Sequence, residues 1–200
     1  MPVTVRTDSC PRREPGAERR AHLAGQGGLL AYSNILSDTN LYRLAGSGPP
    51  VKLCSSTRFD ASPRFSSDGQ RFVFTSDRSG SREIWACEVT GANAVQLTTL
   101  RATQLGSPRW SPDGRSVAFD HFQDGHWHIL VVSADGGPSR RLTTDAADHA
   151  RPAWSADGQW IFFGSNRTTG QDQIWKMSSG GGPPVHVTRN GGWEAIASPD

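Results

Sequence analysis

The stretch Pro108-Arg109-Trp110-Ser111-Pro112-Asp113-Gly114 decides the fold, because most of it returns at a fixed interval along the chain. The Asp-Gly pair recurs at Asp68-Gly69 and Asp157-Gly158, so the spacing is 45 and then 44 residues. Each copy has a proline five residues before the aspartate, and an aromatic-serine pair between the two. These further marks are Pro63 with Phe65-Ser66 and Pro152 with Trp154-Ser155. The chain is therefore an array of repeats.

Two more marks follow the Asp-Gly pair in every unit: an isoleucine with an apolar neighbour, and an apolar-threonine pair that closes the unit. Short β-rich segments lie between the marks, separated by turn-forming clusters. They lack the i, i+3, i+4 apolar spacing of an amphipathic helix. A period near 44 residues with such segments predicts the four-stranded blade of a β-propeller. The isoleucine pairs are Ile84-Trp85, Ile129-Leu130 and Ile174-Trp175. The closing apolar-threonine pairs are Leu97-Thr98, Leu142-Thr143 and Val187-Thr188.

The turns agree with this interpretation. Ser111-Pro112-Asp113-Gly114 has the composition of a type I turn, with proline at the second position and glycine where φ is positive. A two-residue turn at Asp124-Gly125 predicts the register of the next hairpin, in which His121 faces His128. Each unit is therefore expected to fold as consecutive antiparallel hairpins.

We expect an all-β fold: a β-propeller of four-stranded antiparallel blades with about four blades present, three full and two partial. Residues 1–28 lack the repeat and are expected to be a disordered or non-native leader. The chain stops inside a turn motif, and blade 1 lacks an innermost strand, which favours an open arc cut from a longer propeller. The alternative is a four-bladed ring, closed by pairing residues 195–198 beside residues 29–33. The expected blades are 29–57 (partial), 58–100, 101–145, 146–190 and the start of another at 191–200.

Composition excludes several classes of protein. The formal net charge is only +2, and the excess lies in the first 20 residues, which argues against a nucleic-acid partner. No run of eighteen apolar residues exists, so no membrane span is expected. The three cysteines have no C-x-x-C spacing, so neither a zinc site nor a disulfide framework is indicated. The amino terminus has arginines without an apolar segment behind them, unlike a secretory signal.

The repeat resembles the WD-like β-propeller repeat of the TolB family. The Pro108–Gly114 stretch matches the family's opening motif in full, and Ser76-Asp77-Arg78-Ser79-Gly80 and Ser165-Asn166-Arg167 match its hairpin. The resemblance covers about residues 29–200 and implies a propeller that binds partners at its channel mouth, in the periplasm. Similar blades occur in peptidase gating propellers, oligogalacturonate lyases and sensor modules, so the resemblance is specific for the repeat and leaves the function open.

No catalytic motif is found, and no cofactor is expected. The repeated aspartates Asp68, Asp113 and Asp157 hold the same position in every blade, which favours a turn-capping role over paired catalytic carboxylates. The arginines Arg78 and Arg167 also repeat, which favours structural ion pairs or hydrogen bonds between blades. A weak metal candidate is a histidine group on the blade 3 hairpin, for which tolerance of polar residues at an exposed hairpin end is the alternative. Its members are His121, His126 and His128.

The connectors that enter the innermost strands differ between blades while the scaffold does not. Variation of this kind is typical of a binding rim, and also of unconstrained loops. We expect a non-catalytic scaffold that binds a protein or peptide, with self-association through exposed blade edges. The alternatives are the propeller of a larger enzyme, lyase-like or peptidase-associated, and the sensor module of a regulator. The candidate rim residues are Arg58, Asp60, Gln104, His149, Arg151 and Trp193.

Overall fold

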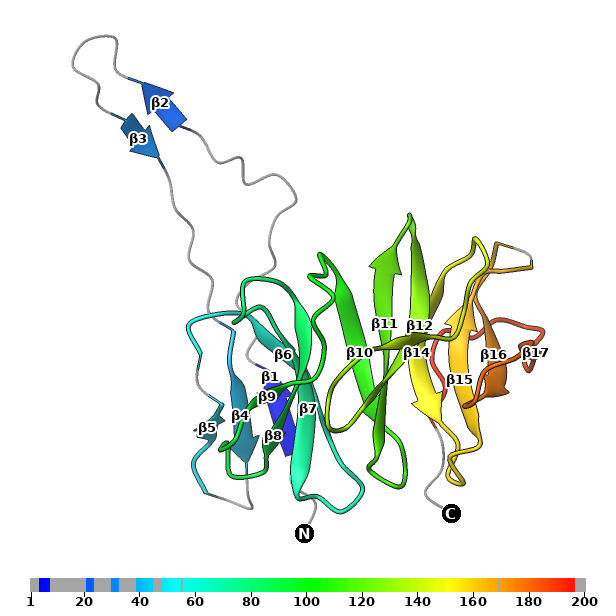
Figure 1. Cartoon of the computed structure of the whole chain (residues 1–200), viewed down its shortest axis with the longest axis horizontal. Coiled ribbons are helices and arrows are strands. Elements are labelled where there is room, and N and C mark those ends of the chain that lie inside the picture. Colours follow the sequence, from blue (N-terminus) through cyan, green and yellow to red (C-terminus); the bar gives the residue numbers. More distant parts are fainter. Residues whose placement is uncertain are drawn as a thin grey trace.

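Three four-stranded antiparallel sheets and one three-stranded sheet lie side by side in chain order, as Figure 1 shows. The computed structural model describes residues 4–7, 21–23, 30–32, 39–44, 48–54, 56–168 and 170–196. The described residues form strands and turns without a helix, so none of their segments is a helix long and apolar enough to cross a membrane. The sheets form an open arc, and the predicted all-β propeller fold is confirmed.

The strands of each full blade follow one another in sheet order. Blade 2 consists of β6 (Asp60–Phe65), β7 (Arg71–Ser76), β8 (Glu83–Glu88) and β9 (Val95–Gln96). Blade 3 consists of β10 (Leu105–Trp110), β11 (Ser116–Gln123), β12 (His126–Ser133) and β13 (Arg140–Arg141). Blade 4 consists of β14 (His149–Trp154), β15 (Trp160–Ser165), β16 (Gln173–Ser178) and β17 (Val185–His186). The predicted register of the blade 3 hairpin, with His121 facing His128, is confirmed.

Blade 1 differs from the prediction at the amino terminus. Its sheet contains β1 (Thr4–Thr7), β4 (Leu41–Leu44) and β5 (Val51–Leu53), and β1 pairs antiparallel with β4. Four residues of the predicted leader therefore belong to a blade sheet, where they add a strand next to β4 that the repeat pattern did not predict. A separate pair joins β2 (Ala21–Leu23) to β3 (Leu30–Tyr32). Among the described residues, 30–32 pair only there; residues 197 and 198 of the alternative ring closure lie outside the described residues. The rest of residues 1–28 lies outside the described residues, and the leader stays a prediction there.

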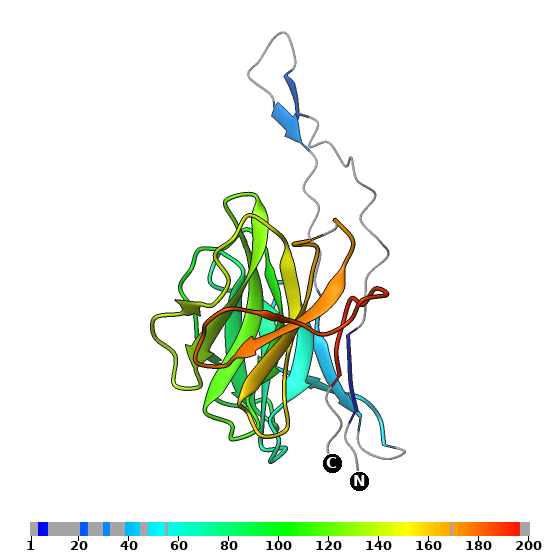
Figure 2. The same ribbon diagram turned by 90° about the vertical axis from the view of Figure 1, so that its right-hand side faces the viewer.

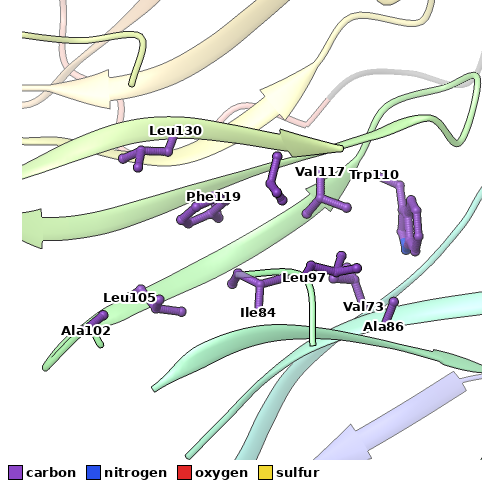
Figure 3. Close-up of a cluster of buried hydrophobic side chains, with 11 residues drawn as sticks. Val73, Ile84, Ala86, Leu97, Ala102, Leu105, Trp110, Val117, Phe119 and Leu130 are labelled. Atoms are coloured by element: carbon purple, nitrogen blue, oxygen red, sulfur yellow. The ribbon is translucent and has the colours of Figure 1, made fainter. Parts of the chain in front are cut away.

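Apolar side chains fill the space between neighbouring blades. Between blades 2 and 3, Val73 and Ile84 meet Val117 and Phe119, all fully buried, as Figure 3 shows. Trp110 closes this cluster with 8% of its surface exposed, and its indole nitrogen donates to the carbonyl of Arg64 in blade 2 at 3.2 Å. An equivalent hydrogen bond joins blades 3 and 4. There, the Trp154 indole donates to the carbonyl of Arg109 at 3.1 Å. The repeated aromatic residue therefore ties each blade to the one before it.

The threonine that closes each repeat has a structural role that the repeat pattern did not reveal. In all three full blades its hydroxyl oxygen accepts a hydrogen bond from the backbone N–H of the repeated isoleucine. Such a bond pairs a backbone donor at the position where the outermost strand leaves the ladder. The pairs are Thr98 with Ile84 at 2.9 Å, Thr143 with Ile129 at 3.0 Å, and Thr188 with Ile174 at 2.9 Å.

The repeated aspartates cap their turns, as predicted. Each carboxylate accepts the hydroxyl of the serine two residues before it and the backbone N–H of the residue two positions after it. The serine hydroxyl bond, followed by the backbone bond, lowers the pKa of Asp68, Asp113 and Asp157. Their equivalent geometry in three blades assigns them to the scaffold.

Replacing Gly114 with alanine is expected to destabilise the chain by about 1 kcal/mol. Gly114 has a φ of +68°, where a side chain strains the backbone although the space around it is open. Urea denaturation of the two proteins measures the difference. The matched control is Gly180→Ala, since Gly180 lacks a positive φ and its added Cβ would make only an ordinary 3.6 Å contact. Equal stability of the Gly114 variant and the control would contradict the turn assignment.

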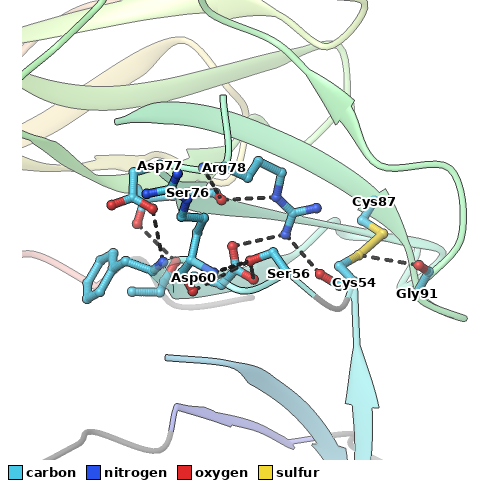
Figure 4. Close-up of polar contacts among 12 residues, drawn as sticks. Cys54, Ser56, Asp60, Ser76, Asp77, Arg78, Cys87 and Gly91 are labelled. Carbon is cyan, nitrogen blue, oxygen red and sulfur yellow. Dashed lines mark hydrogen bonds and ion pairs between the residues drawn. A yellow bond between two sulfur atoms is a disulfide. The ribbon is translucent and has the colours of Figure 1, made fainter. Parts of the chain in front are cut away.

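A disulfide and a hydrogen bond from Arg78 join blades 1 and 2, as Figure 4 shows. Cys54, just after β5, is bonded to Cys87 of β8, so the expectation of no disulfide was wrong for this pair. The pairing depends on two strands of different blades being neighbours, which cysteine spacing does not reveal. Beside it, the Arg78 guanidinium donates to Asp60 and to the Cys54 carbonyl, each at 2.9 Å. The predicted structural role of Arg78 is thereby confirmed.

Candidate functional site

A β-bulge interrupts the innermost strand of each full blade at the residue before the repeated proline. These residues, Ser62, Ser107 and Arg151, have positive φ values of 55°, 47° and 57°. Proline has no N–H to contribute to the ladder, which makes this the natural position for a bulge. A bulge re-aims the side chains next to it. All three bulge residues line one pocket, and we call the surface around it the channel mouth.

A pocket of about 460 Å³ opens at the channel mouth between blades 3 and 4. Its walls combine two indoles, three carboxylates and one guanidinium with six smaller, uncharged residues. The indoles belong to Trp127 and Trp193, the carboxylates to Asp120, Asp148 and Asp172, and the guanidinium to Arg151. The other lining residues are Ser62, Gly106, Ser107, Ala150, Gly164 and Asn166. Aromatic walls with a few oriented polar groups are characteristic of ligand and peptide sites.

Asp120 links the two blades beneath this pocket. Its side chain is buried, and its carboxylate accepts the backbone N–H of Arg151 at 2.8 Å. Burial raises the pKa of the Asp120 carboxyl. At the far wall, burial followed by the negative charge of Asp148 raises the pKa of Asp172. The pocket therefore concentrates carboxylates beside the arginine.

Arg151 and Trp193 form the open side of the pocket. The Arg151 guanidinium lies 5.0 Å from the centre of the Trp193 ring, and 46% of the surface of Trp193 is exposed. Gly164 allows this arrangement, because a Cβ there would lie 2.5 Å from the carbonyl oxygen of Trp193. Figure 2 shows the carboxyl-terminal segment, in red, crossing the strands of blade 4. A large exposed indole held beside a cation is a typical anchor for a binding partner.

The structure brings together two of the six predicted rim residues. Arg151 and Trp193 share the pocket, whereas Arg58 and Gln104 are exposed elsewhere. Asp60 is fully buried in its ion pair with Arg78, and His149 is fully buried beside Asp145. Sequence reasoning missed Asp120 and Trp127, which lie on strands of the scaffold. The repeated proline is the sequence signal that could have indicated their position, because it marks the bulge on the innermost strand.

The three predicted metal-site histidines lie near one another without a metal-binding arrangement. Among the described residues, no group of three or more histidine, cysteine, aspartate or glutamate side chains is placed to hold a metal ion. His128 is buried, and its Nε2 lies 2.7 Å from a guanidinium nitrogen of Arg141. Arginine can only donate, so this nitrogen is the acceptor and its lone pair is already occupied. His128 also holds the blade position that Glu83 and Gln173 hold in blades 2 and 4, which supports a structural role.

His149 makes the stability of the chain sensitive to acid. Burial lowers its pKa from 6.5 to about 4, despite the Asp145 carboxylate 3.0 Å from its ring; the Arg167 and His128 charges also lower it. The unfolded chain binds the proton more readily, so the stabilisation is complete above pH 6.5 and is lost as the pH falls toward 4.

We expect His149→Phe to reduce this loss of stability between pH 7 and pH 4, because phenylalanine keeps the ring contact with Phe163 and has no titrating group. Urea denaturation across that pH range is the measurement. Some pH dependence will remain, because burial also lowers the pKa of His121 and His128. The control is His186→Phe at an exposed site. An unchanged pH profile in the His149 variant would contradict the assignment.

Comparison with known proteins identifies the repeat. The family model described as the TolB β-propeller domain matches residues 100–200. An uncharacterized protein of Agrobacterium fabrum is 30% identical over 84% of this chain and 59% of its own length. A TolB homolog of Chlorobium chlorochromatii is 35% identical over 62% of this chain and 27% of its own. A solved structure from Agrobacterium tumefaciens, assigned to TolB, is 28% identical with a TM-score of 0.70, covering 90% of this chain and 66% of that one.

Peptidases also contain this type of propeller. An uncharacterized peptidase of Bacillus subtilis is 28% identical over 55% of this chain and 22% of its own length. A puromycin hydrolase structure shares the fold at 18% identity with a TM-score of 0.61, covering 86% of this chain and 30% of that one. The chain therefore spans less than two thirds of each of these curated relatives.

Proposed function

We propose, because this chain belongs to the TolB β-propeller domain family, that it is a binding scaffold whose channel mouth recognises a protein or peptide. The observation that carries the proposal is the pocket between blades 3 and 4, where Trp127, Trp193 and Arg151 converge on a rigid sheet framework. Tryptophan and arginine are the residues that most often dominate binding energy in protein interfaces. The pocket residues come from neighbouring blades and the carboxyl-terminal segment, so the surface exists only when the blades are assembled.

The bulges support a binding role. A non-glycine residue with positive φ before a proline is unfavourable, and here it recurs at the same place in three blades. Unfavourable backbone persists where the surrounding structure holds it, and such positions cluster at ligand-binding sites. In this chain the bulge residues Ser62 and Ser107 form part of the pocket wall.

The test is selection of peptides from a random library displayed on phage, followed by affinity measurement with the purified chain. We expect Trp193→Ala to weaken the selected peptides by about thirtyfold, the effect of losing one dominant aromatic contact. The matched control is Trp160→Ala, since Trp160 packs against Lys176 and is not part of the pocket wall. The proposal would be overturned if no peptide is enriched. It would also be overturned if the enriched peptides bind Trp193→Ala and Arg151→Ala with the same affinity as the wild type.

A second candidate is the propeller of a larger peptidase, favoured by the similarity to the Bacillus subtilis peptidase. In that role the channel would control access of peptides to a catalytic domain. A gate selects by size and a docking site selects by sequence. Peptides of equal composition and scrambled order distinguish the two, because equal affinity for the scrambled set favours the gate.

A further inference from the structure

Glu194 spans two arginines of neighbouring blades. One carboxylate oxygen lies 2.9 Å from a guanidinium nitrogen of Arg109 in blade 3, and the other lies 3.1 Å from Arg151 in blade 4. The side chains of Glu194 and Arg109 are 32% and 20% exposed, so the pair is partly removed from water. Removal from water strengthens an ion pair relative to a fully exposed one.

A second hollow, which we call the arginine-lined channel, holds more positive charge than this single glutamate neutralises. Arg64 and Arg109 each follow the repeated proline, and both line a hollow of about 550 Å³ together with Trp110, Trp154 and Glu194. Burial, followed by the positive charge of Arg64, lowers the pKa of Arg109. The opposing charges near Arg109 are Glu194 and the buried Asp120. The lining of this hollow therefore holds two guanidiniums, Arg64 and Arg109, and one carboxylate, Glu194.

We propose that this arginine-lined channel binds the carboxylates of an acidic peptide segment, and that Glu194 is a built-in occupant that such a segment displaces. The inference rests on the proposed binding function and names the chemistry of its partner. Glu194 lies in a segment of this chain that is not part of a strand. The segment shows that an extended peptide has room beside Arg109 and Arg151. Guanidinium groups are suited to carboxylates because their planar N–H donors match the two oxygens.

The internal occupant sets the size of the expected effect. A partner carboxylate must compete with Glu194, so only the fraction of molecules with a free arginine pair is competent to bind. Partly exposed ion pairs contribute up to about 1 kcal/mol, so removing the competitor is expected to raise affinity by about fivefold.

The experiment measures fluorescence anisotropy of a rhodamine-labelled tetraglutamate peptide at low salt, with tetraglutamine as the uncharged counterpart. We expect Glu194→Gln to bind tetraglutamate about fivefold more tightly than the wild type, and more tightly than tetraglutamine. Adding Arg109→Gln or Arg151→Gln to Glu194→Gln is expected to reverse the gain. The matched control is Glu88→Gln, which makes the same charge change at the exposed end of β8 and leaves the affinity near that of the wild type.

The outcomes separate this inference from the proposed function. Equal binding of the two peptides by Glu194→Gln, or an equal gain in Glu88→Gln, overturns the carboxylate site. If the carboxylate site is overturned but the affinity of phage-selected peptides still falls in Trp193→Ala, the proposed binding function is retained and the acidic nature of the partner is rejected. Thermal melting of each variant identifies any that fails to fold, and the two arginine variants provide independent readings.

Discussion

Replacing Trp110 with alanine is expected to lower the free energy of unfolding by about 3–5 kcal/mol, because a cavity opens between blades 2 and 3. The side chain is 8% exposed within the apolar cluster between these blades (Figure 3) and donates its indole N–H to the Arg64 carbonyl. Urea denaturation followed by tryptophan fluorescence and circular dichroism measures the change.

Trp193→Ala is the matched control for this experiment, since Trp193 is 46% exposed and its loss leaves no core cavity. Trp154, for which the repeat predicts an equal effect, is only partly buried, so we expect a smaller loss there. Trp110→Phe keeps most of the apolar contact and loses the hydrogen bond, at a cost of about 1 kcal/mol. A loss below about 1 kcal/mol for Trp110→Ala would contradict the packing between blades.

Replacing Glu83 with alanine is expected to destabilise the chain by about 3–5 kcal/mol, because a buried carboxylate with several donors is removed. Glu83 is fully buried, and its oxygens accept the Thr98 hydroxyl at 2.6 Å and the backbone N–H groups of Leu100 and Arg101 at 3.0 and 2.7 Å. These bonds fix the connector that leads from blade 2 into blade 3. Without them, buried donors are left unpaired.

The comparison with Glu83→Gln tests this explanation. Glutamine keeps the shape and one acceptor oxygen, as Gln173 does in blade 4, where its oxygen accepts the N–H of Gly191 at 3.1 Å. We therefore expect Glu83→Gln to cost less than Glu83→Ala, while Glu88→Ala on the exposed face changes the midpoint of urea denaturation little. Equal losses for Glu83→Ala and Glu88→Ala would show that the carboxylate does not hold the connector.

The blade architecture was predictable because its determinants are local. Asp-Gly turns, the proline before each aromatic residue and the two-residue hairpin at Asp124-Gly125 act over a few residues, so a linear sequence reveals them. The same locality explains the correct register of the blade 3 hairpin and the capping role of Asp113. The strand β1 was missed because it comes from a segment without the repeat, and its pairing with β4 joins residues distant in the sequence.

The candidate site was predicted only in part, for a related reason. Arg151 and Trp193 were found because rim connectors vary, but the same criterion also selected Asp60 and His149, which are buried. Burial depends on tertiary contacts, as when Arg78, just after β7, reaches Asp60 of β6 across 18 positions of sequence. A connector residue therefore cannot be assigned to solvent or scaffold from its position alone.

By itself, the sequence determined an all-β chain of propeller blades, with their turns, hairpins and apolar faces, because these follow from patterns within each repeat. Only the tertiary structure decided which groups of different blades meet. The Cys54–Cys87 disulfide, the approach of Trp193 to Gly164 and the contact of Glu194 with Arg109 all join residues far apart in the chain. The angle between packed sheets sets these distances, and that angle depends on how side chains of two blades fit together.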